Sequence, residues 1–233
     1  MTQSYVPIFN PREVPHIAWS EYADMFIWTK QNWQSLNRAF IQNALMHAHN
    51  VPNLWRQDIS LSENVRQAAV LVLLIECEQG YDVVLTTRAT HLRHHAGQVS
   101  FAGGRIEAGE SEIQAALREA NEEIGLNAQD AIILGAMPDY QTITGFCVTP
   151  VVAMMTDAVW QKQNIQIDEQ EVDQVFTVPL RTLFDRTQMR VHTFKYGEQS
   201  RMFLSVTYES FFIWGASMAM LHNLDLILRA GFE

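Results

Sequence analysis

The amino-acid sequence predicts an α/β or α+β sandwich with one main domain, preceded by an N-terminal helical extension. Between residues 65 and 233, runs of branched apolar residues are interleaved with only two or three helical segments. Residues 1–64 differ in composition, because four of the six tryptophans lie there. A chain of 233 residues is long enough for one full domain with an elaboration. We therefore divide the chain into an extension, 1–64, and a main domain, 65–233.

The extension is expected to contain one clear helix, "SLNRAFIQNALMHAH" (35–49). Leu36, Phe40 and Leu45 recur near helical spacing, and Ser35 is a candidate N-cap. The sequence "NVPN" at 50–53 ends the helical pattern. We expect this helical extension to pack on the main domain.

The main domain is expected to begin with a strand that is buried on both faces. The run "AAVLVLLIEC" (68–77) is continuously apolar and rich in branched residues, which is typical of such strands. A turn, "EQGYD" (78–82), then leads to a hairpin partner, "VVLTTRA" (83–89). Further strands are expected at 131–137, 147–155, 175–180 and 201–210, and a closing helix at 214–228.

The amino-acid composition disfavours some classes of binding partner. The formal net charge is −10, so non-specific binding to nucleic acid or to anionic lipid is not expected. The two cysteines, Cys77 and Cys147, stand alone in apolar runs, which fits a reducing cytosol. The N-terminus lacks the pattern of a signal peptide, and each apolar run is shorter than the roughly 20 residues of a membrane helix. We expect a soluble, cytoplasmic protein.

The stretch "FAGGRIEAGESEIQAALREANEEIGL" (101–126) predicts an acidic helix. Ser111 and Gln114 fit a capping box at its start, and Gly125 is a natural residue to end it. An apolar stripe is expected to face the sheet, formed by Ile113, Ala116, Ala120 and Ile124. Two of these are alanines, so the helix can lie close to its sheet.

Three carboxylates of this helix, Glu119, Glu122 and Glu123, share one face at i, i+3 and i+4. Each like-charge pair costs about 0.2–0.5 kcal/mol on an exposed helix. Carboxylate oxygens are the hard ligands that Mg²⁺ or Mn²⁺ prefers, and substrate phosphates and water complete such sites. The alternative is a solvated acidic helix face, which is the commoner meaning of such clusters.

The wider spacing carries a resemblance to a known family. Gly104 is followed after five residues by Glu110, and after seven more by the run Arg118 to Leu126, "REANEEIGL". This frame resembles the Nudix box, G-x5-E-x7-R-E-U-x-E-E-x-G-U, where U is apolar. The resemblance implies an α-β-α sandwich with a mixed sheet, and hydrolysis of a nucleoside diphosphate linked to another group.

The resemblance also implies roles for residues. The expected metal ligands are Glu119, Glu122, Glu123 and the carbonyl of Gly103 or Gly104. Arg118 is expected to orient the glutamates through ion pairs, and Glu110 to support them. The candidate general bases are Glu119 and Glu171, since a carboxylate near an activated water can take its proton. The expected cofactor is Mg²⁺ or Mn²⁺.

The preceding segment, "LTTRATHLRHHAGQVSFAGG" (85–104), is locally basic. Five of the eight residues from Arg88 to His95 can carry positive charge, which suits a substrate with several phosphates. A solvated hairpin end is an open alternative, whereas a zinc site at His91, His94 and His95 is disfavoured because a cysteine or fourth ligand is not nearby.

This segment resembles the coenzyme A pyrophosphatase branch of the Nudix hydrolases, L-L-T-x-R-[SA]-x3-R-x3-G-x3-F-P-G-G, with Ala102 in place of proline. The resemblance implies cleavage of coenzyme A or its derivatives to 3′,5′-ADP and a 4′-phosphopantetheine product. It further implies phosphate binding by Arg88, Arg93 and His95. Glu171 matches the branch's E-V-x-x-V-F segment, although a plain loop glutamate is an alternative.

Other interpretations stay open at this stage. The substrate could be another nucleotide, such as an ADP-sugar or NADH, or the chain could be a non-catalytic module that senses a nucleotide. A homodimer is compatible with the sequence. Trp214 is expected in the core rather than stacked on an adenine ring, and His192 is expected to be a satisfied histidine rather than a base.

Overall fold

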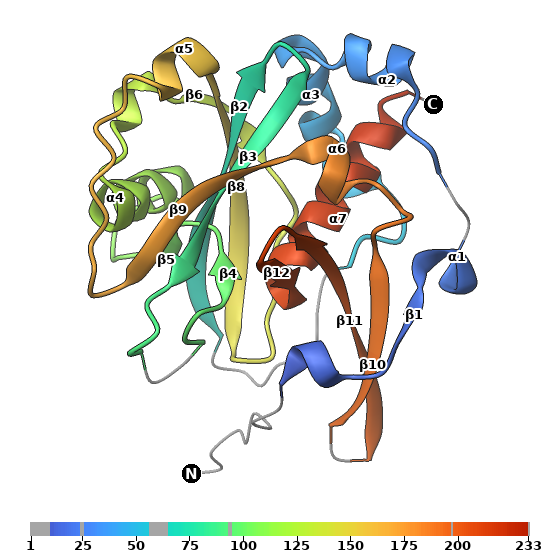
Figure 1. Ribbon diagram of the computed structural model, residues 1–233. Helices are drawn as coiled ribbons and strands as arrows, with labels where there is room; N and C mark the ends of the chain where they lie inside the picture. The colour runs from blue at the N-terminus through green and yellow to red at the C-terminus, as the bar shows by residue number, and fades with distance from the viewer. Residues whose placement is uncertain (1–9, 24–25, 56–64, 93–94, 197, 233) are drawn as a thin grey trace.

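A computed structural model describes residues 10–23, 26–55, 65–92, 95–196 and 198–232. Its centre is a mixed sheet whose main path runs β4-β3-β2-β8-β6, with β5 paired to β2, β7 to β8 and β9 to β3 (Figure 1). β2 and β8 are parallel neighbours, and the other pairs are antiparallel. The strands of this sheet are β2 (Arg66–Cys77), β3 (Gly80–Arg88), β4 (Val99–Ser100), β5 (Gly103–Arg105), β6 (Ile132–Ala136), β7 (Tyr140–Gln141), β8 (Phe146–Thr156) and β9 (Val172–Pro179).

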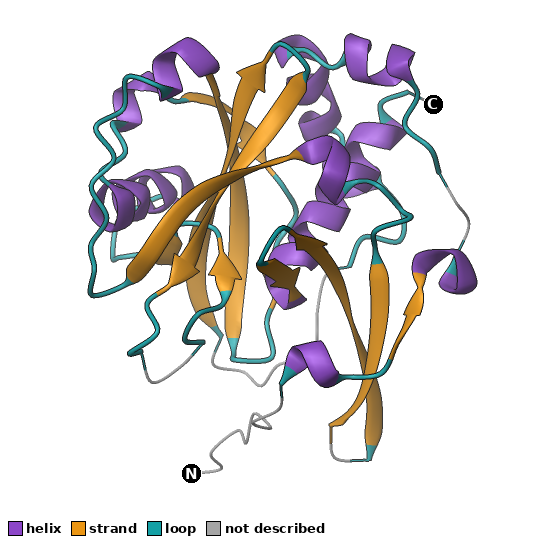
Figure 2. Ribbon diagram, in the orientation of Figure 1, coloured by secondary structure: helices purple, strands orange, loops and turns teal. Residues whose placement is uncertain are grey.

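Helices cover both faces of this sheet, which confirms the predicted α/β sandwich (Figure 2). One face packs against α4, and the other packs against α3 and α7. The helices are α1 (Trp19–Tyr22), α2 (Lys30–Ser35), α3 (Arg38–Met46), α4 (Glu112–Ile124), α5 (Asp157–Trp160), α6 (Leu180–Leu183) and α7 (Gly215–Ala230). None of the helices within the described ranges is long and apolar enough to cross a membrane.

The central strand β2 is buried on both faces, as its apolar run predicts. Leu71, Leu73 and Ile75 pack with α4, while the alternate residues Val72 and Leu74 pack with α3 and α7. This follows from the period of two along a strand, which sends neighbouring side chains to opposite faces. One strand therefore connects the two apolar cores.

A second, antiparallel sheet contains four strands in the order β1-β10-β11-β12. These strands are β1 (His16–Ala18), β10 (Arg190–Tyr196), β11 (Gln199–Tyr208) and β12 (Phe211–Trp214). β1 comes from the N-terminal extension, where only helices were expected. His192 lies inside this sheet and is satisfied, since its ring bonds to the carbonyl of Val14 and to the hydroxyl of Ser205.

Two local expectations were wrong. The helix expected at 35–49 is the shorter α3, because Leu36 adopts an extended backbone and Asn37 caps α3 by accepting from the amide of Phe40. Ser35 ends α2 and is not an N-cap. In α4, Ile113 is 38% exposed, and Ala115 belongs to the buried face with Ala116, Ala120 and Ile124.

Tryptophans of the extension bind to α7. The indole nitrogen of Trp28 donates to Asp225 over 2.7 Å. The backbone of Trp55 exchanges two hydrogen bonds with the side chain of Asn223, at 2.8 and 2.7 Å. Because residues 56–64 lie outside the described ranges, the boundary at residue 64 stays a prediction.

These contacts surround a buried polar cluster on α7. Arg186 forms an ion pair with the buried carboxylate of Asp225 and a 2.9 Å hydrogen bond with the ring of His222. The Arg186 guanidinium also lies 4.5 Å from the ring centroid of Trp19. Burial, together with the nearby positive charges of Arg186 and Arg229, lowers the pKa of His222 from 6.5 to about 3. His222 is thus neutral in the folded protein.

This neutrality predicts acid sensitivity. Below about pH 6.5 the unfolded chain protonates His222 and the folded chain does not, so the free energy of unfolding falls as pH drops from 6.5 towards 3. The contribution is at most about 1.4 kcal/mol per pH unit. In denaturant titrations across this range, His222→Gln should show a shallower pH dependence, and the exposed control His47→Gln should match the wild type. Equal pH slopes for all three proteins would contradict this prediction.

Candidate functional site

The acidic helix α4 begins and ends at its predicted caps. The hydroxyl of Ser111 accepts from the amide of Gln114, whose side chain in turn accepts from the amide of Ser111. Gly125 adopts a left-handed conformation with φ 68°, and its amide donates to the carbonyl of Asn121 over 2.9 Å. Both caps are local in sequence, and they fix which residues face the sheet.

The glycine pair Gly103–Gly104 allows β5 to lie close to β2 and to α4. A Cβ atom on Gly103 would stand 2.4 Å from the carbonyl oxygen of Ala69 on β2. A Cβ atom on Gly104 would stand 2.4 Å from the carboxylate of Glu119. The absence of side chains here therefore places the Glu119 carboxylate directly against the backbone of β5.

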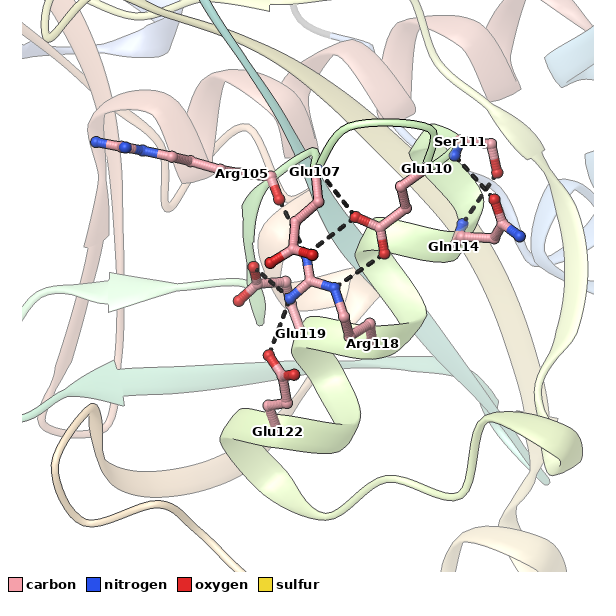
Figure 3. A network of polar contacts seen from close by, with 8 residues as sticks. All are labelled: Arg105, Glu107, Glu110, Ser111, Gln114, Arg118, Glu119 and Glu122. Atoms are coloured by element: carbon pink, nitrogen blue, oxygen red, sulfur yellow. Dashed lines mark hydrogen bonds and ion pairs between the residues drawn. The ribbon is translucent and has the colours of Figure 1, made fainter.

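Arg118 organises the carboxylates around it (Figure 3). Its guanidinium binds Glu110 through two hydrogen bonds of 2.9 and 3.1 Å, and it binds Glu119 and Glu122 at 2.9 Å each. It also donates to the carbonyl of Arg105 over 3.0 Å. The bonds from Arg118 lower the pKa of Glu110, and the carboxylates raise the pKa of Arg118. Arg118 thus binds three of the four box carboxylates, and its role in orienting them stays a prediction.

Glu123 lies on the buried side of the helix rather than on its solvated face. It is 4% exposed, and one carboxylate oxygen accepts from the amide of Gly103 over 3.3 Å. Burial and the negative charge of Glu171 raise the pKa of Glu123 to about 8, against the opposing effect of Arg88. Burial also raises the pKa of Glu119, with Arg118 opposing it. The negative charge of the clustered carboxylates is therefore only partly compensated by Arg118 and Arg88.

Residues from outside the helix lie beside this cluster. Arg88, at the end of β3, is close enough to Glu123 to influence its charge. Glu171 is exposed and follows a loop whose backbone bonds to the end of α4, through Asp168 to Glu123 over 2.9 Å. The amide of Ala89 donates to the carbonyl of Glu171 over 2.9 Å, so β3 holds this glutamate near the site.

The other two predicted phosphate-binding residues, Arg93 and His95, lie between β3 and β4 in the sequence. His95 is exposed, adopts φ 59°, and its ring bonds to the side chain of Gln98 over 2.8 Å. Arg93 lies outside the described residues. The structure therefore brings Arg88 and Glu171 to the glutamates, and places His95 on the adjoining loop.

Within the described residues, no group of three or more His, Cys, Asp or Glu side chains is close enough to hold a metal ion. Glu122 is turned to Arg118, and its side chain is 58% exposed. The donor set still fits a divalent cation. Glu119 presents carboxylate oxygens beside Gly104, Glu123 presents one to the amide of Gly103, and the buried Glu123 has two acidic neighbours.

Comparison with known proteins decides the family, because the model of the NUDIX domain matches residues 65–198.

The chain belongs to the Nudix family.

Curated relatives agree. Uncharacterized Nudix hydrolases named NudL from Salmonella paratyphi B and Salmonella newport are each 38% identical over 166 residues, which cover 70% of this chain and 83% of the relative. A solved structure of a MutT protein from Methanosarcina mazei Go1 aligns with a TM-score of 0.48 and 16% identity, over 75% of this chain and 100% of that one.

As a Nudix hydrolase, the protein acts on the pyrophosphate bond of a nucleoside diphosphate derivative, and enzymes of this family generally use divalent metal ions. Sequence reasoning missed the backbone groups that complete this Nudix site, namely the Arg105 carbonyl and the Asp168 amide. The residue types at positions 105 and 168 do not determine where these two backbone groups lie, so the sequence did not reveal them.

The close approach at Gly104 gives a direct test of the site. In Gly104→Ala the new methyl group must displace the Glu119 carboxylate, because 2.4 Å is too short for a non-bonded contact. We expect the protein to fold, since the end of a flexible side chain can move, but to lose about 100-fold in pyrophosphohydrolase kcat/KM.

A matched control is Gly109→Ala, where the backbone has φ 85° and the space around the glycine is open. This variant carries backbone strain without touching a carboxylate, so it should lose stability but keep its activity. Wild-type activity in Gly104→Ala, or an equal loss in both variants, would contradict the role of the close approach.

Proposed function

We propose that the protein is a divalent-metal-dependent pyrophosphohydrolase that cleaves the diphosphate of coenzyme A or its derivatives to 3′,5′-ADP and a 4′-phosphopantetheine product. The observation that carries the proposal is the position of the segment that contains Arg88. The residue after Arg88, Ala89, donates its amide to the carbonyl of Glu171 over 2.9 Å, and the same loop bonds to the end of α4 through the Asp168 amide and the Glu123 carbonyl, also over 2.9 Å. The segment that resembles the coenzyme A branch therefore lies beside the Nudix box, which supports this substrate.

The proposed cation-binding residues are Glu119, Glu122, Glu123 and the carbonyl of Gly103. When bound, Mg²⁺ or Mn²⁺ supplies Lewis-acid chemistry, offsetting phosphate charge and activating water. The Glu122 side chain is 58% exposed, so it can rotate towards a bound cation. Arg118 positions Glu110, Glu119 and Glu122 through its fork of hydrogen bonds, while the buried Glu123 accepts from the amide of Gly103.

Proton transfer and phosphate binding are assigned to neighbouring side chains. Glu119 or Glu171 accepts the proton of the attacking water, since both carboxylates lie close enough to influence one another. Arg88, His95 and Arg93 bind the phosphate oxygens of the substrate, because a guanidinium fork matches phosphate geometry. Their charge matters in a protein whose formal net charge is −10.

Two alternative functions, hydrolysis of another nucleotide and nucleotide sensing without catalysis, predict different assay results. An ADP-sugar or NADH contains the same diphosphate, so a panel of nucleotides assayed for 3′,5′-ADP and other products decides the substrate. Equal or faster turnover of ADP-ribose than of coenzyme A would overturn the proposal. A non-catalytic sensor would not need the box carboxylates, all of which are present in this chain.

Substitution of Glu123 tests catalysis. Glu123→Gln keeps the size of this buried side chain and replaces a carboxylate oxygen with an amide nitrogen that cannot bind a cation, so kcat for coenzyme A should fall by about 100-fold or more while the thermal transition stays near that of the wild type. Glu112→Gln, in the exposed first turn of the same helix, is the matched control and should retain wild-type kcat. Unchanged kcat in Glu123→Gln would refute the site.

Removal of the metal gives a second test. Dialysis against EDTA should abolish hydrolysis of coenzyme A, and adding back Mg²⁺ or Mn²⁺ should restore it, because the clustered carboxylates need a cation to bind a diphosphate. The measurement is the rate of 3′,5′-ADP release by chromatography. Full activity in the chelated protein would exclude the proposed metal dependence.

A further inference from the structure

A cavity of about 430 Å³ lies where the N-terminal extension meets the main domain. Its three walls are the turn at Pro11–Arg12, the end of the β3–β4 loop at Ala96–Val99, and the segment Ser210–Trp214 with strand β12. β4 and β12 lie side by side (Figure 1). The hydroxyl of Ser217 donates to the carbonyl of Val99 over 3.0 Å, which fixes β4 against α7. The volume falls in the range of small-molecule sites.

One wall of the cavity is aromatic. We define the aromatic wall as Phe211, Phe212 and Trp214, all of which line the cavity and are only partly buried. The ring of Phe211 stacks on that of Phe176 with centroids 3.7 Å apart, so β9 holds it in place. Trp214 was expected in the core, and its partial exposure on this wall corrects that expectation. Such a wall suits a planar ring.

The cavity is also lined by one positively charged side chain, that of Arg12. Arg12 is the single charged side chain among the described residues that line it. Its guanidinium lies 4.9 Å from the ring centroid of Phe212, and one of its N–H groups donates to the carbonyl of Ser210 over 3.0 Å. Two contacts thus position a guanidinium that has five N–H donors, which leaves donors for a ligand.

The cavity is joined to the catalytic cluster through β3. Thr87 lines the cavity, whereas the adjacent Arg88 acts on Glu123, and a register shift in the β3–β9 pairing lies between them. The amide of Arg88 donates to the carbonyl of Gln98, and the amide of Gly97 donates to the carbonyl of Arg88, both over 2.9 Å. The loop that walls the cavity is therefore hydrogen-bonded to a residue of the proposed diphosphate site.

We propose that this cavity binds the 3′-phosphorylated adenosine end of the substrate, with the base on the aromatic wall and the 3′-phosphate on Arg12. The inference rests on the proposed function and adds a role for the N-terminal extension. Coenzyme A has two ends beyond its diphosphate. The nucleotide end carries both a planar ring and an extra charge, whereas the pantetheine arm carries neither, so the combination of aromatic wall and guanidinium selects the nucleotide end.

The test is a binding measurement that needs no catalysis. Isothermal titration calorimetry of the full chain should show 3′,5′-ADP binding about tenfold or more tightly than 5′-AMP, which lacks the 3′-phosphate. In Arg12→Met, which keeps an apolar side chain of similar length over Phe212, this preference should disappear. Arg38→Met replaces an exposed arginine on α3 and is the matched control, which should keep the preference.

Kinetics separate binding from chemistry. For coenzyme A, Arg12→Met should raise KM about tenfold and leave kcat near the wild-type value, and it should change the KM of dephospho-coenzyme A by less than twofold. A preference for 3′,5′-ADP that survives in Arg12→Met would overturn the inference. So would competition by 4′-phosphopantetheine that Arg12→Met abolishes, since the cavity would then hold the other end.

Failure of the two proposals can be told apart. If the protein does not hydrolyse coenzyme A but binds 3′,5′-ADP through Arg12, the proposed function fails and the cavity assignment stands. If it hydrolyses coenzyme A and Arg12→Met behaves as the wild type towards every ligand, the cavity assignment fails and the proposed function stands.

Discussion

The guanidinium of Arg118 holds Glu110, Glu119 and Glu122 together, and the candidate site depends on this interaction. Glu119 and Glu122 on α4, together with Glu110 just before the helix, would otherwise repel one another. With Arg118 in place, the helix keeps its regular form, Glu119 stays against Gly104, and β5 stays paired to β2. The proposed chemistry thus starts from a charge arrangement that the chain has largely built before any ligand binds.

The two faces of the large sheet have different structural roles. The face towards α4 carries small alanines, which let the acidic helix approach β2 and β5 closely. The other face carries the larger core with α3 and α7, and there the extension is fixed by Trp28 and Trp55. Because β2 contributes side chains to both cores, changes in one core are transmitted to the strand that positions the other.

Local signals predicted α4 and the long strands well, and long-range pairing limited the rest. The caps Ser111 and Gly125 are encoded within a few residues, so both ends of the helix were correct. The short strand β1 exists only by pairing with β10, far along the chain, and was missed. Helical spacing predicted an apolar face but not which flank would be covered, so Glu123 is buried and Ile113 exposed. Arg12 gave no signal, since it meets Ser210 across 198 residues.

Because the extension packs on α7, the chain cannot be shortened to the family segment without losing part of its core. The family match ends at residue 198, before β11, β12 and α7 begin. A chain cut to that length would lose α7, one of the two helices that cover one face of the central sheet. A chain beginning at residue 65 would instead lose Trp28, whose indole N–H donates to the buried carboxylate of Asp225. The segment that defines the family is therefore not an autonomous unit in this protein, whose interior is completed from both ends of the polypeptide.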